Sequence, residues 1–159
     1  MPLRLPSIVP TTAGRCIGVV GDVYRMLATG KETDGKYALI DALVPPGGGP
    51  PPHRHSREEE GFYVLDGELT ITCDGERQTL SAGMFANLPI GSLHSFKNEG
   101  ATAVRMLILI APAGLEEMFL EVGQPLEAGT TTAPPPGHEE IEKLIAVAPR
   151  YGVELQLPQ

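Results

Sequence analysis

Two histidines and a glutamate lie close together in the middle of the 159-residue sequence. His53 and His55 are two residues apart, so on a β-strand both imidazoles point to the same face. Glu60 follows soon after, and neutral imidazoles that converge with a carboxylate form a site suited to a first-row divalent metal ion. The residue types and their spacing therefore indicate a metal site.

The five-residue step from His55 to Glu60 has the wrong parity for one continuous strand, which would send Glu60 to the opposite face. We expect a turn or β-bulge over residues 56–59 that resets the parity, so that Glu60 begins the next strand and points inward. A bulge shifted by one residue would promote Glu59 instead. If Glu60 is the residue that points inward, Glu58 and Glu59 are expected to be solvated turn residues.

A third histidine, His94, follows Pro89 and Gly91, which are turn-forming residues. A turn at that point lets His94 begin a strand and point into the same cavity. His138 stands at the start of a predicted helix instead, and we interpret it as a surface residue. The candidate ligands are thus predicted to lie on strands and next to turns, so the rest of the sequence should contain further strands that pair with these.

Turn signals divide the chain into short runs. Gly and Pro number 19 and 16, which favours many short elements joined by turns. Asp34-Gly35, Asp66-Gly67 and Asp74-Gly75 each separate two strand-like runs, and Asp-Gly suits the positive φ angles of tight hairpins. The predicted strands are 22–29, 36–44, 61–65, 68–73, 76–80, 85–88, 94–98 and 101–110. The last of them is apolar on both faces apart from Arg105, so we expect it to lie between two layers.

Two helices are predicted after the last strand. Apolar residues recur at helical spacing from Leu115 and again from Ile141, and we expect Gly123 and Pro149 to end the two helices. The Met and Phe side chains of the first helix are expected to pack against the strands. The pattern predicts an all-β fold in one domain (1–159): an eight-strand antiparallel barrel or jelly roll over about 22–112, with a helical extension over about 113–149 packed on its outside.

The spacing of these residues resembles the two sequence motifs of the cupin family. The first motif, G-x5-H-x-H-x4-E-x6-G, is matched by Gly47, His53, His55, Glu60 and Gly67. The second motif, G-x5-P-x-G-x2-H-x3-N, is matched by Gly83, Pro89, Gly91, His94 and Asn98. The resemblance implies a double-stranded β-helix that holds one divalent transition metal ion (Fe, Mn, Ni, Co, Cu or Zn). It assigns the ligand roles to His53, His55, Glu60 and His94, and it implies a homodimer.

Apolar side chains are expected to surround the metal and exclude water from it. These expected pocket residues are Phe62, Val64, Leu69, Ile71 and Phe96. The similarity to the quercetin 2,3-dioxygenase-like branch implies a metal-dependent dioxygenase that acts on a small enolisable or aromatic compound of the flavonol or diketone kind. Two alternatives stay open. One is a non-oxidative isomerase, lyase or epimerase in which Glu60 or a metal-bound water is the catalytic base. The other is a sensor that binds a small ligand without converting it.

Charge and composition exclude several other partners. Lys and Arg number 12 against 20 Asp and Glu, which gives a net charge of −8. A nucleic-acid binder needs a cationic surface, so nucleic acid is not an expected partner. The longest apolar run, 106–112, is far shorter than the ~20 residues of a membrane helix, and no signal peptide is recognisable. We therefore expect a cytoplasmic protein with no membrane partner and with a small-molecule substrate.

Overall fold

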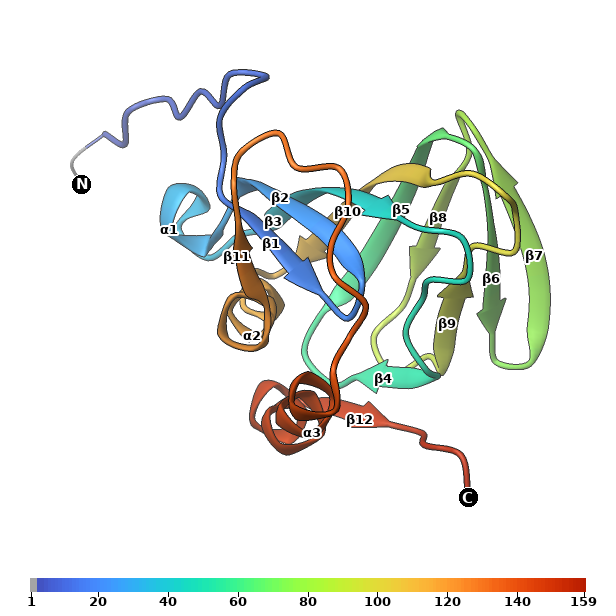
Figure 1. Ribbon diagram of the computed structural model, residues 1–159. Helices are drawn as coiled ribbons and strands as arrows, with labels where there is room; N and C mark the ends of the chain where they lie inside the picture. Colours follow the sequence, from blue (N-terminus) through green and yellow to red (C-terminus); the bar gives the residue numbers. More distant parts are fainter. Residues whose placement is uncertain (1–2) are drawn as a thin grey trace.

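The long strand Val104–Ala111 alternates buried and more exposed side chains, as expected for an element that turns one face to a core. The computed structural model describes residues 3–159. Figure 1 shows two groups of strands that face each other, with helices beside one end. The strands are β1 (Cys16–Val19), β2 (Asp22–Ala28), β3 (Ala38–Val44), β4 (His53–His55), β5 (Glu59–Asp66), β6 (Glu68–Cys73), β7 (Glu76–Ser81), β8 (Phe85–Leu88), β9 (His94–Lys97), β10 (Val104–Ala111), β11 (Gln124–Leu126) and β12 (Val153–Leu155). The helices are α1 (Gly30–Thr33), α2 (Leu115–Val122), α3 (His138–Val147) and the 3-10 helix η1 (Ala148–Tyr151).

Antiparallel pairing joins these strands into two sheets. A seven-stranded sheet has the order β11-β1-β2-β3-β10-β5-β8, and a five-stranded sheet has the order β12-β4-β9-β6-β7. Many neighbours within a sheet are distant in the chain, so the strands wrap as a jelly roll rather than as a series of consecutive hairpins. The predicted all-β fold, a double-stranded β-helix with C-terminal helices, is confirmed.

The core is filled by the inward faces of the strands. On β5, Phe62 and Val64 have no exposed surface, whereas Tyr63 and Leu65 are 39% and 37% exposed. This alternation is the one predicted for a strand that begins with an inward Glu60. The strand therefore carries a polar group and two core residues on the same face, which places Glu60 against the interior.

Strand β10 does not lie between two layers, and that prediction was wrong. Its inward residues, among them Met106 and Ile108, are buried, but Leu109 on the other face is 37% exposed. An antiparallel sheet packs one face on the core and leaves the other toward solvent, even when apolar side chains occupy both. On the outer face, Arg105 donates hydrogen bonds to both carboxylate oxygens of Asp41 on the neighbouring strand β3.

The segment between β2 and β3 is a short helix rather than the predicted tight hairpin at Asp34-Gly35. Helix α1 follows Thr29, whose backbone N–H donates to the carboxylate of Glu32 at 2.8 Å while its own side chain caps the helix. This capping box satisfies amide groups at the start of the helix and favours a helical turn there. Asp34 then ends the helix in a left-handed conformation, at φ 56°.

Both predicted C-terminal helices are present, but the second one packs on the rest of the protein with a different face from the one that its apolar spacing predicts. Helix α2 ends before Gly123 as predicted. In α3, Ile141 and Ile145 are each 39% exposed, although their spacing predicts a buried stripe. The carboxylate of Glu140 accepts a hydrogen bond from the backbone N–H of Val20 at 2.7 Å. That bond ties the neighbouring face of α3 to the β1–β2 turn. Among residues 3–159, no helix is both long enough and apolar enough to cross a bilayer.

Strands from outside the predicted barrel range of 22–112 extend both sheets. Strand β1 pairs with β2 on one side and with β11 on the other. Strand β12 pairs with β4, and its residues Val153 and Leu155 lie opposite His55 and His53. The candidate ligand strand therefore has the chain's last strand as a neighbour (Figure 1).

Candidate metal centre

The first two candidate ligands come from β4, a strand of three residues. His53 and His55 are 7% and 3% exposed, and Arg54 between them faces solvent. The H-x-H spacing therefore places both imidazoles on the inward face, as expected from strand geometry. On its other side, β4 pairs with β9, where His53 lies opposite His94.

Glu60 reaches the same point because the chain turns between β4 and β5. Strand β5 begins at Glu59, which is exposed, so the next residue points inward and Glu60 is 5% exposed. The turn thus resets the parity as predicted, and Glu59 lies on the outer face. His94 begins β9 after a turn in which the Ser92 N–H donates to the Pro89 carbonyl at 3.1 Å.

The four side chains converge. One potential ligand atom from each of His53, His55, Glu60 and His94 lies within 4.8 Å of the other three. Glu60 Oε2 is 3.1 Å from His55 Nε2 and 3.0 Å from His94 Nε2. The His53 ring is centred 4.5 Å from the His94 ring. The sequence motifs had assigned these four residues, and the fold brings all of them to one buried point.

The side chains of the cluster differ in the direction in which their pKa values are shifted. Burial lowers the pKa of His53 to about 4, a shift that the charge of Glu60 only partly opposes. Burial also favours the neutral form of His55, but the hydrogen bond and charge of Glu60 outweigh it and raise the pKa of His55. Burial would raise the pKa of Glu60, yet hydrogen bonds from His55 and His94 outweigh it and hold that pKa well below its usual range. Glu60 is therefore a carboxylate, and a metal ion that binds here must displace protons.

The remaining ring nitrogens face acceptors that suit metal-binding histidines. His53 Nδ1 lies 2.9 Å from the Pro51 carbonyl, and His94 Nδ1 lies 3.2 Å from the Ser92 carbonyl. A proton on Nδ1 leaves the Nε2 lone pair free for a metal ion, and such acceptors fix the ring orientation. Three imidazoles and one carboxylate within 4.8 Å thus fit a divalent transition metal ion.

Glu58 is part of this arrangement, although the sequence predicted a solvated turn residue. Its side chain is buried, with 3% of the residue exposed, because the turn folds it back under His55. Its Oε2 lies 3.9 Å from His55 Nδ1, and burial raises the pKa of Glu58. Sequence reasoning missed this role because Glu58 was assigned to a turn, where no strand periodicity indicates whether a side chain points inward.

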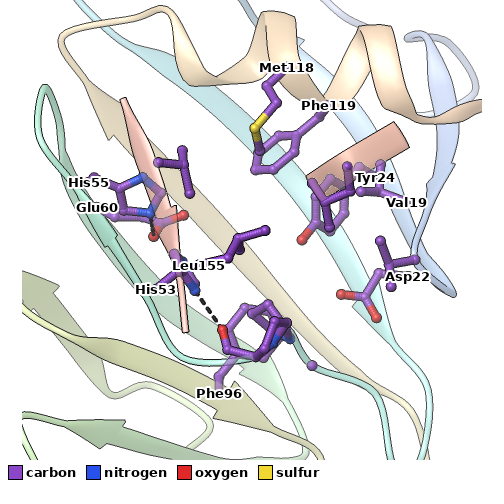
Figure 2. A pocket seen from close by; sticks show the side chains of 16 residues that line it. Val19, Asp22, Tyr24, His53, His55, Glu60, Phe96, Met118, Phe119 and Leu155 are labelled. Carbon is purple, nitrogen blue, oxygen red and sulfur yellow. Dashed lines mark hydrogen bonds and ion pairs between the residues drawn. The ribbon is translucent and has the colours of Figure 1, made fainter. Parts of the chain in front are cut away.

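A cavity of about 70 Å³ opens beside His53, His55 and Glu60. Its other walls come from β1, β2, the loop before β4, β9, both C-terminal helices and β12. Figure 2 shows Tyr24, Phe96 and Phe119 among these wall residues. The lining residues are Val19, Val20, Asp22, Tyr24, Gly49, Pro50, Pro51, His53, His55, Glu60, Phe96, Met118, Phe119, Leu144, Val153 and Leu155. Apart from the candidate ligands, the wall is mainly apolar.

Of the five expected pocket residues, only Phe96 lines this cavity. Phe62, Val64, Leu69 and Ile71 belong to the hydrophobic core between the sheets instead. They are buried on inward strand faces, where side chains of the two sheets pack against each other. Phe62 still contacts the centre, because its ring is centred 6.5 Å from that of His94.

A model of the cupin domain matches residues 41–110 of this chain. The oxalate-binding protein of Thermotoga maritima is 30% identical to it over 112 residues, which make up 69% of this chain and 93% of that protein. The chain belongs to the cupin family. The three histidines and the glutamate of its motifs, assigned from sequence spacing, are those that the structure gathers in the candidate metal centre.

Two further comparisons place this cupin more broadly. It is 27% identical over 123 residues to quercetin 2,3-dioxygenase of Bacillus subtilis, and the match covers 77% of this chain but 36% of that protein. The crystal structure of an RmlC-like cupin from Shewanella frigidimarina matches it with a TM-score of 0.60 at 19% identity, over 72% of this chain and 99% of the other. The second likeness shows the fold alone.

The walls of the cupin cavity also contain residues that sequence reasoning did not single out. Met118 and Phe119 of α2 were expected only to pack on the strands, yet both line the cavity, and Phe119 lies edge-on to Tyr24 with ring centroids 5.1 Å apart. Asp22 and Tyr24 of β2 line it as well. The sequence held only a weak indication that Asp22 and Tyr24 line a cavity, namely that these two polar residues have strand spacing and directly follow the Val20-Gly21 turn.

Proposed function

We propose that this cupin is a metal-dependent dioxygenase that acts on a small enolisable compound of the diketone kind. The observation that carries the proposal is the position of the His/Glu cluster: His53, His55 and Glu60 form one wall of a cavity whose other walls are mainly apolar. A site with a metal-binding wall and an open space beside it suits catalysis, whereas a structural metal site is closed by its own ligands.

The size of the cavity bears on the substrate. Its volume is about 70 Å³, and it is partly open to solvent rather than sealed. A short acyclic compound fits this space better than a flavonol, which has three rings. We therefore favour a small dicarbonyl compound over a flavonol as the substrate.

The residues of the centre support a reaction that begins with enolisation. A bound divalent transition metal ion would supply Lewis acidity and, when redox-active, the electron transfer that oxygen chemistry needs. We assign Glu60, the carboxylate of the cluster, as the candidate proton acceptor from the carbon next to the substrate carbonyl. Because its lowered pKa makes Glu60 a weak base, this role depends on a Lewis acid that makes the substrate C–H more acidic. His53 stays neutral because burial lowers its pKa to about 4. Apolar walls such as Phe96 and Phe119 exclude water and strengthen charge interactions in the site.

The relatives support two candidate functions. The similarity to a quercetin 2,3-dioxygenase supports oxygen chemistry, although the match spans 36% of that protein. The T. maritima relative is named as an oxalate-binding protein, and this chain covers 93% of it. That second observation supports an alternative proposal, in which the protein binds a small chelating compound without converting it.

The test combines metal analysis with oxygen consumption. Protein loaded with each candidate metal is given pentane-2,4-dione in an oxygen electrode, and the same mixture is followed without oxygen. Consumption of one O₂ per diketone supports the dioxygenase. Turnover that persists without oxygen contradicts it and assigns a non-oxidative lyase or isomerase. Binding without turnover under both conditions, with oxalate as a second probe, assigns the binding-only function.

A matched pair of histidine variants provides the control. His94→Ala removes a residue of the buried cluster and should abolish both metal content and turnover. His138→Ala removes an exposed histidine whose side chain is 85% accessible and pairs with Glu142 on the surface of α3. This second variant should retain metal content and turnover. Equal activity of the two variants would contradict the proposed site.

A further inference from the structure

Asp22 stands across the cavity from the metal centre. It is the first residue of β2, directly after a turn in which Val20 and Gly21 have positive φ angles of 49° and 90°. Asp22 and Tyr24 are two residues apart on the strand, so both point inward, and both line the cavity. Figure 2 shows them on the side of the cavity opposite His55 and Glu60.

The carboxyl group of Asp22 is buried without a full set of partners. The residue is 4% exposed, and its Oδ1 has no hydrogen-bond partner among residues 3–159. A buried oxygen without a partner is unfavourable, and in native proteins it calls for a specific explanation. Since Asp22 faces a cavity, a bound ligand is the direct explanation.

The lining residues of the cavity include neither Lys nor Arg, so no lysine or arginine of the wall pairs with Asp22. The ionisable lining residues besides Asp22 are Tyr24, His53, His55 and Glu60. Burial raises the pKa of Asp22 to about 8, and the Tyr24 hydroxyl offsets only part of this rise. At neutral pH the group is therefore mostly a neutral carboxylic acid, which can both donate and accept a hydrogen bond.

We propose that the cavity selects a ligand with two different ends: an oxygen-chelating head at the His/Glu cluster, and a neutral hydroxyl or carbonyl group that hydrogen-bonds Asp22. This assignment rests on the proposed function for the chelating head and adds the chemistry of the far end. A second carboxylate at the far end is rejected, because it would meet Asp22 in a wall without Lys or Arg. The ligand class is a small 2-oxo acid or diketone that carries a terminal hydroxyl or keto group.

The test measures binding to zinc-loaded protein by calorimetry, since zinc is redox-silent and leaves the probes unoxidised. Three probes share a 2-oxo acid head and differ at the far end: 4-hydroxy-2-oxobutanoate ends in a hydroxyl, 2-oxopentanoate in a methyl, and 2-oxoglutarate in a carboxylate. The wild-type protein should bind the hydroxyl probe about tenfold more tightly than either of the others, as expected for one buried hydrogen bond.

Two Asp22 variants and one control separate a selective role from a structural one. Asp22→Asn keeps a donor and an acceptor, so it should keep the preference for the hydroxyl probe over the methyl probe. Asp22→Leu should bring these two affinities to within about threefold, at unchanged zinc content. Asp66→Asn changes an exposed aspartate at the end of β5 and should behave as the wild type.

The outcomes distinguish this proposal from the function on which it rests. Equal affinity of the wild type for the three probes, tightest binding of 2-oxoglutarate, or no binding of any probe would overturn the assignment of Asp22. An Asp22→Leu variant that keeps its fold, its zinc and the hydroxyl preference would overturn it too. If the preference is found but no probe or diketone is converted with any metal, the assignment stands and the enzymatic function fails.

Discussion

His55 Nδ1 and Glu58 Oε2 lie 3.9 Å apart, and neither atom has a hydrogen-bond partner among residues 3–159. The two groups form a buried carboxylate–histidine pair directly behind the candidate metal centre. A small movement would turn the contact into a hydrogen bond from Nδ1–H to the carboxylate. Such a bond holds the ring in position and makes the opposite nitrogen a better metal ligand.

Glu58→Gln should weaken metal binding about tenfold, at the low end of the range for residues behind metal ligands, because the amide keeps its shape but loses the negative charge. Competition with a fluorescent zinc chelator measures the change. Glu59→Gln is the matched control, since Glu59 is the neighbouring glutamate and is exposed. Identical affinities of the two variants would show that the pair does not act on the metal.

Asp41, on the outer face of the larger sheet, forms ion pairs with Arg25 and Arg105. These pairs should make the free energy of unfolding depend on pH in the acid range. Burial raises the pKa of Asp41, but hydrogen bonds from Arg105 and Arg25 outweigh burial and hold the pKa below its usual value of 3.8. A lowered folded-state pKa means that the stabilisation is present above 3.8 and is lost as the pH falls through the folded-state value.

Asp41→Asn should therefore lower the free energy of unfolding at pH 7 by about 1–2 kcal/mol, a modest figure because Arg105 is half exposed and solvent screens the pair. Urea unfolding at pH 7 and near pH 2.5 checks this. The difference between variant and wild type should shrink at the lower pH. A difference of equal size at both values would contradict the assigned linkage.

Removal of residues 153–159 should weaken the metal centre without touching a ligand. Strand β12 pairs with β4 along its whole length, so β4 would become an edge strand with backbone groups open to water. We expect faster amide hydrogen exchange at residues 53–55 and weaker zinc binding. Removal of residues 157–159, which lie beyond the pairing, should change neither quantity. Full zinc affinity in the longer truncation would contradict this dependence.

Met118→Ala should enlarge the cavity, because Met118 lines it and is only 4% exposed. The variant should lose about 2–5 kcal/mol of stability and bind 1-phenylbutane-1,3-dione more tightly relative to pentane-2,4-dione. Val122→Ala truncates a buried residue of the same helix that does not line the cavity. It should lose stability without the shift in preference. A similar shift in both variants would place the effect in the helix rather than in the wall.

Local spacing accounts for most of what the sequence predicted correctly. The H-x-H pair has strand periodicity, and turn residues before His94 and between His55 and Glu60 decide which way those side chains face. These signals act over a few residues, and they placed all four members of the cluster on inward faces. They also gave α2 its correct end at Gly123.

Long-range contacts account for what the sequence could not predict. The pairing of β12 with β4 joins segments far apart in the chain, and neither segment has a pattern that names its partner. Met118 and Phe119 carry ordinary helical spacing, so nothing local distinguishes a cavity wall from a packed core. The burial of Glu58 depends on how one turn folds back under His55. Each of these features follows from tertiary packing rather than from periodicity.

The pairing of His53 with Leu155 has a consequence for how the protein matures. During translation the ribosome makes β4 about a hundred residues before the strand that flanks it. The nascent polypeptide can therefore offer its first two imidazoles to solvent long before their permanent neighbour exists. If β12 stabilises the candidate metal centre as predicted above, stable binding of an ion should follow the synthesis of residue 155.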